Sequence, residues 1–167
     1  MARQAMEAVG RAGLGSTPLW EGDEAASATY VNGAVLVNSS GFIAESSADG
    51  DNIVGVAVKA GGNGGSNGAK RARFVPALPH ILFEANVDDS GDLGNGAYVD
   101  ADMWKHYALA KDADGKWYID KADTTNVRVC IVGISDPAAR AAADAATARI
   151  QARVQFVFLG DKTNFDS

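Results

Sequence analysis

The stretch that decides the fold is residues 32–58, NGAVLVNSSGFIAESSADGDNIVGVAV. An apolar run up to Val37 predicts a strand, and the polar residues 38–41 that follow, ending in glycine, suit a tight turn. Residues 42–45 predict the return strand of a hairpin. Residues 53–60 are apolar at nearly every position, rich in valine and too short for a helix, which indicates a strand buried on both faces. The stretch therefore predicts a hairpin followed by a buried strand.

A second stretch, residues 96–135, repeats this order of features. It runs from GAYVD through a turn at ADGK into WYIDK, and then into the apolar run VRVCIVGIS. When the two stretches are aligned, Gly33 corresponds to Gly96, Gly41 to Gly115, and Gly55 to Gly133. Two similar units packed together would make a small barrel or sandwich. The alternative is that short β motifs look alike by chance.

The rest of the chain completes a mainly β fold class. With 167 residues, of which 19 are Gly and 4 Pro, the chain fits one domain with many turns. Residues 150–158 alternate apolar and polar, as a strand with one buried face does. Pro76 and Pro79 argue against a helix, and against a central strand, up to His80. The Gly-rich loop 61–69 is expected to be flexible, or held by a neighbour.

Two segments stand apart from the strands. Residues 1–18 predict an extended N-terminal arm with one or two helical turns at its start, ordered only against a partner, or else a disordered terminus. SDPAARAAADAATA predicts one short Ala-rich helix near residues 137–147, because a capping residue and a proline precede a run of alanines. Residues 19–167 are expected to form a single β domain.

Charge and composition exclude several classes of function. The net charge of −6 argues against a nucleic-acid-binding protein, whose binding face is basic. A lone cysteine, Cys130, cannot form an internal disulfide. No apolar stretch reaches the roughly 18 residues of a membrane span, and the N-terminus lacks the apolar core of a signal peptide. We expect a protein made in a cytoplasm, with no nucleic-acid or membrane partner.

The motifs that suggest chemistry each lack a required partner. Residues 64–68 match G-x-S-x-G, but the following residues do not predict the helix that a nucleophile elbow needs. His80 and His106 have no second ligand at metal-binding spacing. Asp88, Asp89 and Asp92 crowd one loop, where turn formation competes with calcium binding as the explanation. We therefore expect no enzyme activity, no catalytic residue, no metal ligand and no cofactor.

The residues that we expect to contact a partner lie in the arm and beside the Gly-rich loop. The basic cluster borders the loop and could meet an acidic surface, although such runs are commonly solvated. Trp20 ends the arm and could anchor it, whereas Trp104 and Trp117 are expected to pack in the sheet. The six candidates are Arg3, Arg11, Trp20, Lys70, Arg71 and Arg73.

These blocks together resemble the capsid decoration (cement) proteins of tailed phages. In that family a G-x-x-V strand leads to a short G-x-[IVL] hairpin, a turn and an [IV]-[IV]-G-[IV]-A strand, as in residues 32–58. The blocks FVPALPHILFEANV, GAYVD, CIVGIS and ARVQFVFL follow in the family's order. The resemblance covers residues 29–135 and the last strand. The Gly-rich loop and the Ala-rich helix lie outside the pattern.

The resemblance implies a structural role and no catalytic residues. Such proteins bind the major capsid protein on the outside of an expanded capsid, often as homotrimers, and brace the junctions between capsomers. The implied locations are the virion exterior and, during assembly, the host cytoplasm. Two alternatives stay open: another virion component, such as a head-fibre base or a tail protein, and a carbohydrate-binding β module or an enzyme that uses the Asp-rich loops and exposed aromatic residues.

Overall fold

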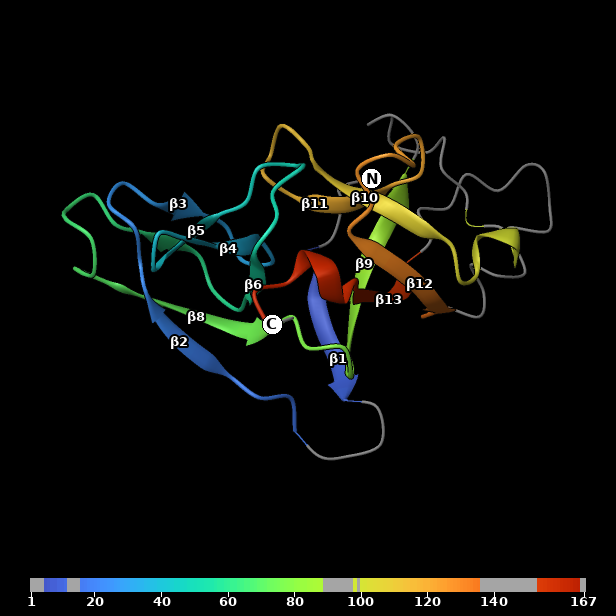
Figure 1. Ribbon diagram of the computed structural model, residues 1–167, viewed down its shortest axis with the longest axis horizontal. Coiled ribbons are helices and arrows are strands. Elements are labelled where there is room, and N and C mark those ends of the chain that lie inside the picture. The colour runs from blue at the N-terminus through green and yellow to red at the C-terminus, as the bar shows by residue number, and fades with distance from the viewer. Residues whose placement is uncertain (1–4, 12–15, 89–97, 99, 136–152, 166–167) are drawn as a thin grey trace.

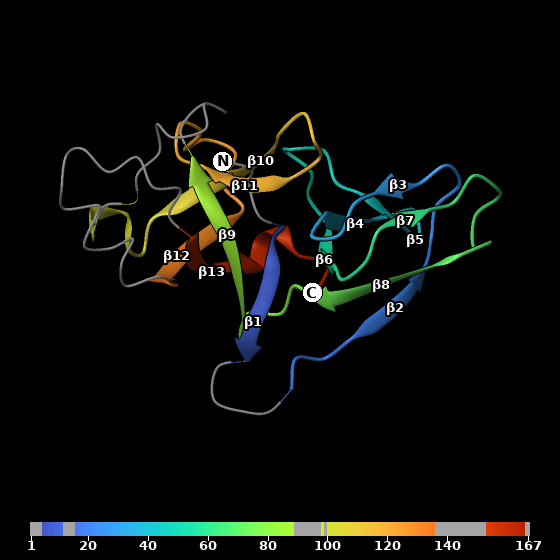
Figure 2. The ribbon, with the colours of Figure 1, turned by 180° about the vertical axis from the view of Figure 1, so that it is seen from behind.

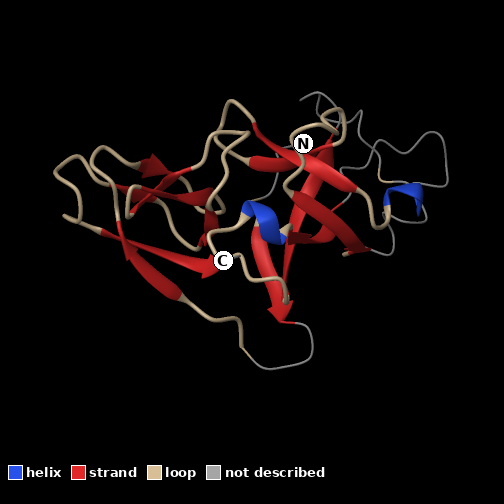
Figure 3. Ribbon diagram, in the orientation of Figure 1, coloured by secondary structure: helices blue, strands red, loops and turns tan. Residues whose placement is uncertain are grey.

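The computed structural model of the chain describes residues 5–11, 16–88, 98, 100–135 and 153–165 (Figure 1). These residues form a mainly β fold, as predicted, with strands joined by loops and two three-residue 3-10 helices (Figure 3). No helix in this part of the chain is long and apolar enough to cross a membrane. The Ala-rich helix predicted near residues 137–147 lies outside the described residues.

The C-terminal half is a closed five-stranded barrel. Its strands pair in the order β9-β11-β10-β12-β13, and β13 returns to β9. Four of the five pairings are antiparallel, and β9 and β11 are parallel. In β13 the residues Val154, Phe156 and Phe158 are buried and alternate with half-buried ones, which confirms the predicted period of two. The strands are β9 (Ile81–Asp88), β10 (His106–Lys111), β11 (Trp117–Asp120), β12 (Val129–Ile134) and β13 (Arg153–Phe158).

The N-terminal half is a five-stranded sheet that nearly closes in the same way. Its order is β2-β8-β6-β4-β5, and its two edges meet at a single parallel bridge between Glu24 and Ile43. All of β6 is buried, as its apolar run predicted. A small second sheet pairs β3 (Thr29–Tyr30) with β7 (Gly61–Gly62). The five strands are β2 (Trp20–Asp23), β4 (Val35–Ser39), β5 (Phe42–Glu45), β6 (Ile53–Ala57) and β8 (Arg71–Pro76).

The two halves share one topology, which confirms the predicted pair of hairpin-plus-strand units. In each half the first strand of a hairpin, β4 or β10, pairs on its other side with the following strand, β6 or β12. The next strand, β8 or β13, runs antiparallel to that one. Strand β8 or β13 also pairs with the earliest strand of its half, β2 or β9. That earliest strand in turn lies parallel to the second strand of the hairpin, β5 or β11.

The hydrogen bonds correct the predicted pairing of residues between the halves. In the turn before β4, the N–H of Ala34 donates to Val31 O (3.2 Å) and that of Gly33 donates to Ala57 O (2.9 Å). In the turn before β10, Lys105 N donates to Asp102 O (3.1 Å) and Trp104 N to Ile131 O (2.8 Å). Gly33 therefore matches Trp104, and not Gly96.

The strand register gives a second correction. Gly55 pairs with Leu36, and the corresponding pair in the other half is Val129 with Tyr107, so Gly55 does not match Gly133. The strand equivalent to β4 is β10, which begins after the 3-10 helix η1 (Asp100–Asp102), and residues 96, 97 and 99 of the block GAYVD lie outside the described part. Short runs of glycine and β-branched residues recur within one chain, so letters alone did not set the register.

Residues 7–11 of the predicted arm form a strand of the protein's own sheet. This strand, β1 (Glu7–Arg11), pairs antiparallel with β9, and Figure 2 shows the two side by side. The expectation of helical turns is wrong for residues 7–9, which belong to this strand. On one edge of β9, only residues 87–88 pair with β11. Residues 81–84 of that edge would otherwise have unpaired backbone groups, and such an edge favours the addition of a further strand, which here is β1. Residues 1–4 and 12–15 lie outside the described part.

Pro76 ends a strand that lies between two others, so the expectation of no central strand before His80 is wrong. The N–H of Ala77 donates to Val54 O on the β6 side. Because successive residues face opposite edges, the nitrogen of Pro76 faces the β2 side. There β2 pairs with β8 only from Phe74 to Arg71, so no hydrogen bond is lost at Pro76.

One hydrophobic core runs through both halves, and polar contacts join them. Buried Arg128 donates to Asp49 O (2.5 Å) and Gly50 O (3.1 Å) of the N-terminal half. Glu45 accepts from Trp117 Nε1 (3.0 Å) and Lys111 Nζ (2.9 Å) of the C-terminal half. After β13 the chain crosses back through the 3-10 helix η2 (Gly160–Lys162), which lies between the halves in Figure 1.

Candidate functional site

Trp104 is an exposed aromatic residue in a strained turn. Its side chain is 69 % exposed, and its φ of 65° lies in the left-handed region that favours glycine. The matching position of the other half holds Gly33, with a φ of 81°. A residue other than glycine pays roughly 1–2 kcal/mol for this conformation. Such strain persists mainly where a side chain has a function, which makes Trp104 a candidate contact residue.

The expectation that two tryptophans pack in the sheet is therefore half right. Trp117 is buried (1 % exposed), whereas Trp104 is not. Trp104 could be recognised as unusual only once the fold was known, because the matching turn of the other half has a glycine, Gly33, at the same position. Exposed Lys105 and His106 follow it, so the surface beside the indole is polar and able to carry positive charge.

Trp20 is half-exposed and packs against the C-terminal segment. The rings of Trp20 and Phe165 meet edge to face, with centroids 5.2 Å apart. Trp20 begins β2, so it is fixed to the N-terminal sheet and not to a free arm. Arg3 lies outside the described residues, as does the side chain of Arg11, the last residue of β1.

Arg71 and Arg73 of the predicted basic cluster lie on β8 and pair with acids on β2. Arg73 Nε lies 3.3 Å from Glu21 Oε1, and Arg71 lies within 3.7 Å of Glu21 and 3.5 Å of Asp23. All these side chains are about half-exposed, so each ion pair contributes little to stability. Lys70 Nζ donates to Gly62 O at 2.5 Å. The cluster is thus partly neutralised within its own sheet.

The cluster lines a charged groove of about 450 Å³ that sequence reasoning did not find. Backbone residues 60–62 form another part of its wall. Glu24 is the one buried charged residue among those that line it. The charged side chains are Lys59, Lys70, Arg71 and Arg73, with Glu21 and Glu24.

The Gly-rich loop is held against this groove by hydrogen bonds, which agrees with the second of the two predicted states. Buried Asn63 donates to Ser66 O (2.9 Å) and Glu24 O (3.3 Å) and accepts from Gly65 N (3.0 Å). Asn67 Oδ1 accepts from Ala26 N (2.6 Å). Polar side chains supply the order that a glycine tract lacks by itself.

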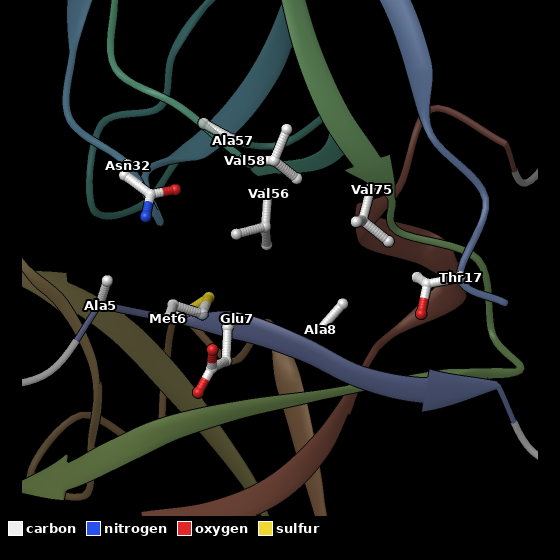
Figure 4. A pocket seen from close by; sticks show the side chains of 10 residues that line it. All are labelled: Ala5, Met6, Glu7, Ala8, Thr17, Asn32, Val56, Ala57, Val58 and Val75. Carbon is white, nitrogen blue, oxygen red and sulfur yellow. The ribbon is translucent and has the colours of Figure 1, made fainter.

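A second, smaller cavity of about 250 Å³ lies where β1 meets the N-terminal sheet. Figure 4 shows Val56 and Val75 on one side and Met6, just before β1, with Ala8 of β1 on the other, and Glu7 pointing away. Met6 is fully buried. This cavity lies at the seam between the halves, and its lining combines apolar side chains with the polar residues Thr17 and Asn32.

In the part of the chain that the structure describes, the fold does not complete the motifs that suggested chemistry. Residues 64–68 lead into β8 and not into a helix, and both histidines are exposed. Within the described residues no three His, Cys, Asp or Glu side chains come together as a metal site requires. Asp88 is buried at the end of β9, and Asp89 and Asp92 lie outside that part.

Comparison of the chain with protein-family models, with curated proteins and with solved structures found no match. The functional argument therefore depends on the chain's own surfaces. Of these, the Trp104 turn carries an exposed indole and the groove carries exposed cationic side chains.

Proposed function

We propose that this protein is a structural component of a phage virion that binds the outside of the capsid and stabilises the junctions between capsomers. The observation that carries partner binding is Trp104, an exposed indole held at a φ of 65°. Tryptophan is enriched among the residues that dominate protein interfaces. Half of the proposal, binding to another protein, depends on this residue.

The other half, the capsid as partner, depends on the resemblance of residues 29–135 to decoration proteins. The block with the strongest resemblance, residues 32–58, forms β4, β5 and β6. A shared core and the contacts of Arg128 and Glu45 hold the two halves together, which suits a brace under load. Many copies on a regular shell would convert a modest single contact into strong retention.

The test is co-sedimentation with expanded capsids assembled from the major capsid protein encoded in the same genome. Unmodified protein should co-sediment and raise the temperature at which capsids rupture. Trp104→Ala should weaken binding by at least about tenfold, the effect of losing a dominant interface side chain. Leu19→Ala is the matched control, because Leu19 is an exposed apolar residue of the other half. Failure of the unmodified protein to bind capsids or virions contradicts the proposal.

Two alternatives predict different results. A head-fibre base or tail protein would be present in a handful of copies per virion, and a decoration protein in hundreds. A carbohydrate-binding module is favoured by the polar groove beside β8 and by exposed Trp104, since sugars stack on indoles and hydrogen-bond to charged groups. Saccharide binding on a glycan array, without capsid binding, would support that alternative.

A further inference from the structure

Glu24, one of the residues that line the charged groove, has a buried carboxylate oxygen without a described hydrogen-bond partner. The side chain is only 2 % exposed, and Oε1 accepts a hydrogen bond from Tyr30 OH (2.5 Å). Its second oxygen, Oε2, is buried and has no hydrogen-bond partner among the described residues. Burying a carboxylate oxygen without a donor is unfavourable, so such an atom is unusual unless a ligand completes it.

The C-terminal half contains the same pair of groups with a third group added. Asp102 is equally buried, and its Oδ1 accepts from Tyr107 OH (2.7 Å). Its Oδ2 contacts the ammonium group of Lys121 at 2.5 Å. In this chain a buried carboxylate bound to a tyrosine is thus completed by an ammonium group. Among the described residues, no ammonium group contacts Glu24 Oε2 in the way that Lys121 Nζ contacts Asp102 Oδ2.

The rest of the groove favours an anion. Four cationic side chains and two carboxylates line it, so its charge is positive on balance. Arg71 and Arg73 contact Glu21 at 3.3–3.7 Å, in exposed pairs that a ligand can open at little cost. Lys59 is exposed and makes no ion pair within the described residues.

We propose that the groove binds a small zwitterion, with its ammonium group on Glu24 Oε2 and its carboxylate or phosphate on Lys59, Lys70 and the arginines of β8. A simple anion leaves Glu24 unsatisfied and close to a like charge. A simple cation meets four positive side chains. A ligand that carries both charges satisfies both parts of the site. This inference is independent of capsid binding, because Trp104 belongs to the other half.

The test is an NMR titration that follows the backbone amides of the unmodified protein. Phosphoethanolamine and γ-aminobutyrate are the two zwitterionic probes and distinguish phosphate from carboxylate as the anionic group. Inorganic phosphate and ethylamine each supply one charge alone. We expect saturable shifts at residues 60–62 and 70–73, with at least one zwitterion binding about tenfold or more tightly than either single-charge probe.

Variants assign the two charges to residues. Glu24→Gln keeps an acceptor for Tyr30 but loses the negative charge, and should remove the preference for a zwitterion over inorganic phosphate. Lys59→Met should weaken every anionic probe by several-fold. Lys105→Met is the matched control, because it removes an exposed lysine of the other half and should change nothing.

Three outcomes overturn the proposal. The first is the absence of saturable shifts with both zwitterions. The second is equal binding of phosphate and phosphoethanolamine to the unmodified protein, which would make the groove an anion site only. The third is binding that Lys59→Met does not affect. Where Glu24→Gln fails to fold, the comparison of probes on the unmodified protein and the Lys59→Met variant still decide the question.

Discussion

Gly33 and Trp104 occupy the same position of two matching turns, with φ values of 81° and 65°. The N–H of Gly33 donates to Ala57 O of β6, and the N–H of Trp104 donates to Ile131 O of β12. One half therefore has the residue that the backbone favours, and the other half has an exposed indole. At this one position, an exposed and strained side chain in one half corresponds to an unstrained glycine in the other.

Trp104→Gly should stabilise the fold while it weakens partner binding. Glycine adopts a positive φ without steric cost, so relief of strain should add up to about 1 kcal/mol to the free energy of unfolding, less the entropy that glycine adds to the unfolded chain. Urea denaturation measures the first effect and capsid co-sedimentation the second. Trp104→Ala is the control that removes the indole but retains the strain. A loss of stability in Trp104→Gly would show that the indole packs on the fold.

Gly33→Ala should be strongly destabilising. Its φ of 81° disfavours alanine, and a Cβ would lie 2.7 Å from Met6 O and 2.8 Å from Met6 N, in the segment that leads into β1. We expect a loss of roughly 2–4 kcal/mol, as backbone strain and overpacking add. Chemical denaturation measures it. Gly41→Ala, also at positive φ but with open space around it, should lose only the strain contribution, and equal losses would contradict the steric argument.

Met6→Ala tests whether β1 belongs to the fold. Met6 is 1 % exposed and packs in the shared core, so its truncation should cost roughly 2–5 kcal/mol. Val9→Ala, at an exposed position within β1 itself, should change stability by no more than about 0.5 kcal/mol. The two unfolding free energies are compared by urea denaturation. Similar small effects at both positions would indicate that residues 5–11 do not contribute to stability.

The sequence predicted the elements of this fold better than their partners. The buried run that became β6, the alternation in β13 and the duplicated order of strands are local patterns, and local patterns persist in any tertiary setting. The equivalence of Gly33 and Trp104 depends on hydrogen-bond register between strands far apart in the chain, which no local pattern encodes. The open edge of β9, which accepts β1, likewise exists only once the barrel has formed.

The candidate site followed the same division. Lys70, Arg71 and Arg73 were found as a run of charge, but the acids on β2 that pair with the two arginines lie about 50 residues earlier, so this neutralisation was not visible. Glu24 carried no signal, because a single glutamate before a turn resembles any surface acid. Its burial and its contact with Tyr30 arise from the pairing of β3 with β7 beside it.

Gly61→Ala and Gly62→Ala form a matched pair beside the groove. A Cβ on Gly61 would overlap the ring of Tyr30, whereas a Cβ on Gly62 would meet nothing closer than Ala28 O at 3.9 Å. We expect Gly61→Ala to lose roughly 1–3 kcal/mol and Gly62→Ala to remain close to the unmodified protein. Thermal unfolding measures both. If both variants unfold alike, the packing of Tyr30 on Gly61 is wrong.

Tyr30 and Tyr107 should ionise only well above the usual pH for tyrosine. Burial, together with the hydrogen bonds to Glu24 and Asp102, raises the pKa of both phenols above the ordinary value near 10. Because the folded state holds protons that the unfolded state loses from about pH 10 upward, the contribution of these two phenols to the free energy of unfolding should be constant below about pH 10 and should fall as the pH rises further. Phenolate absorbance during alkaline titration should show late ionisation that coincides with loss of the folded circular dichroism signal. Tyr30→Phe and Tyr107→Phe should each remove one late-ionising group, and simultaneous ionisation of all tyrosines near pH 10 in the folded protein would exclude these buried pairs.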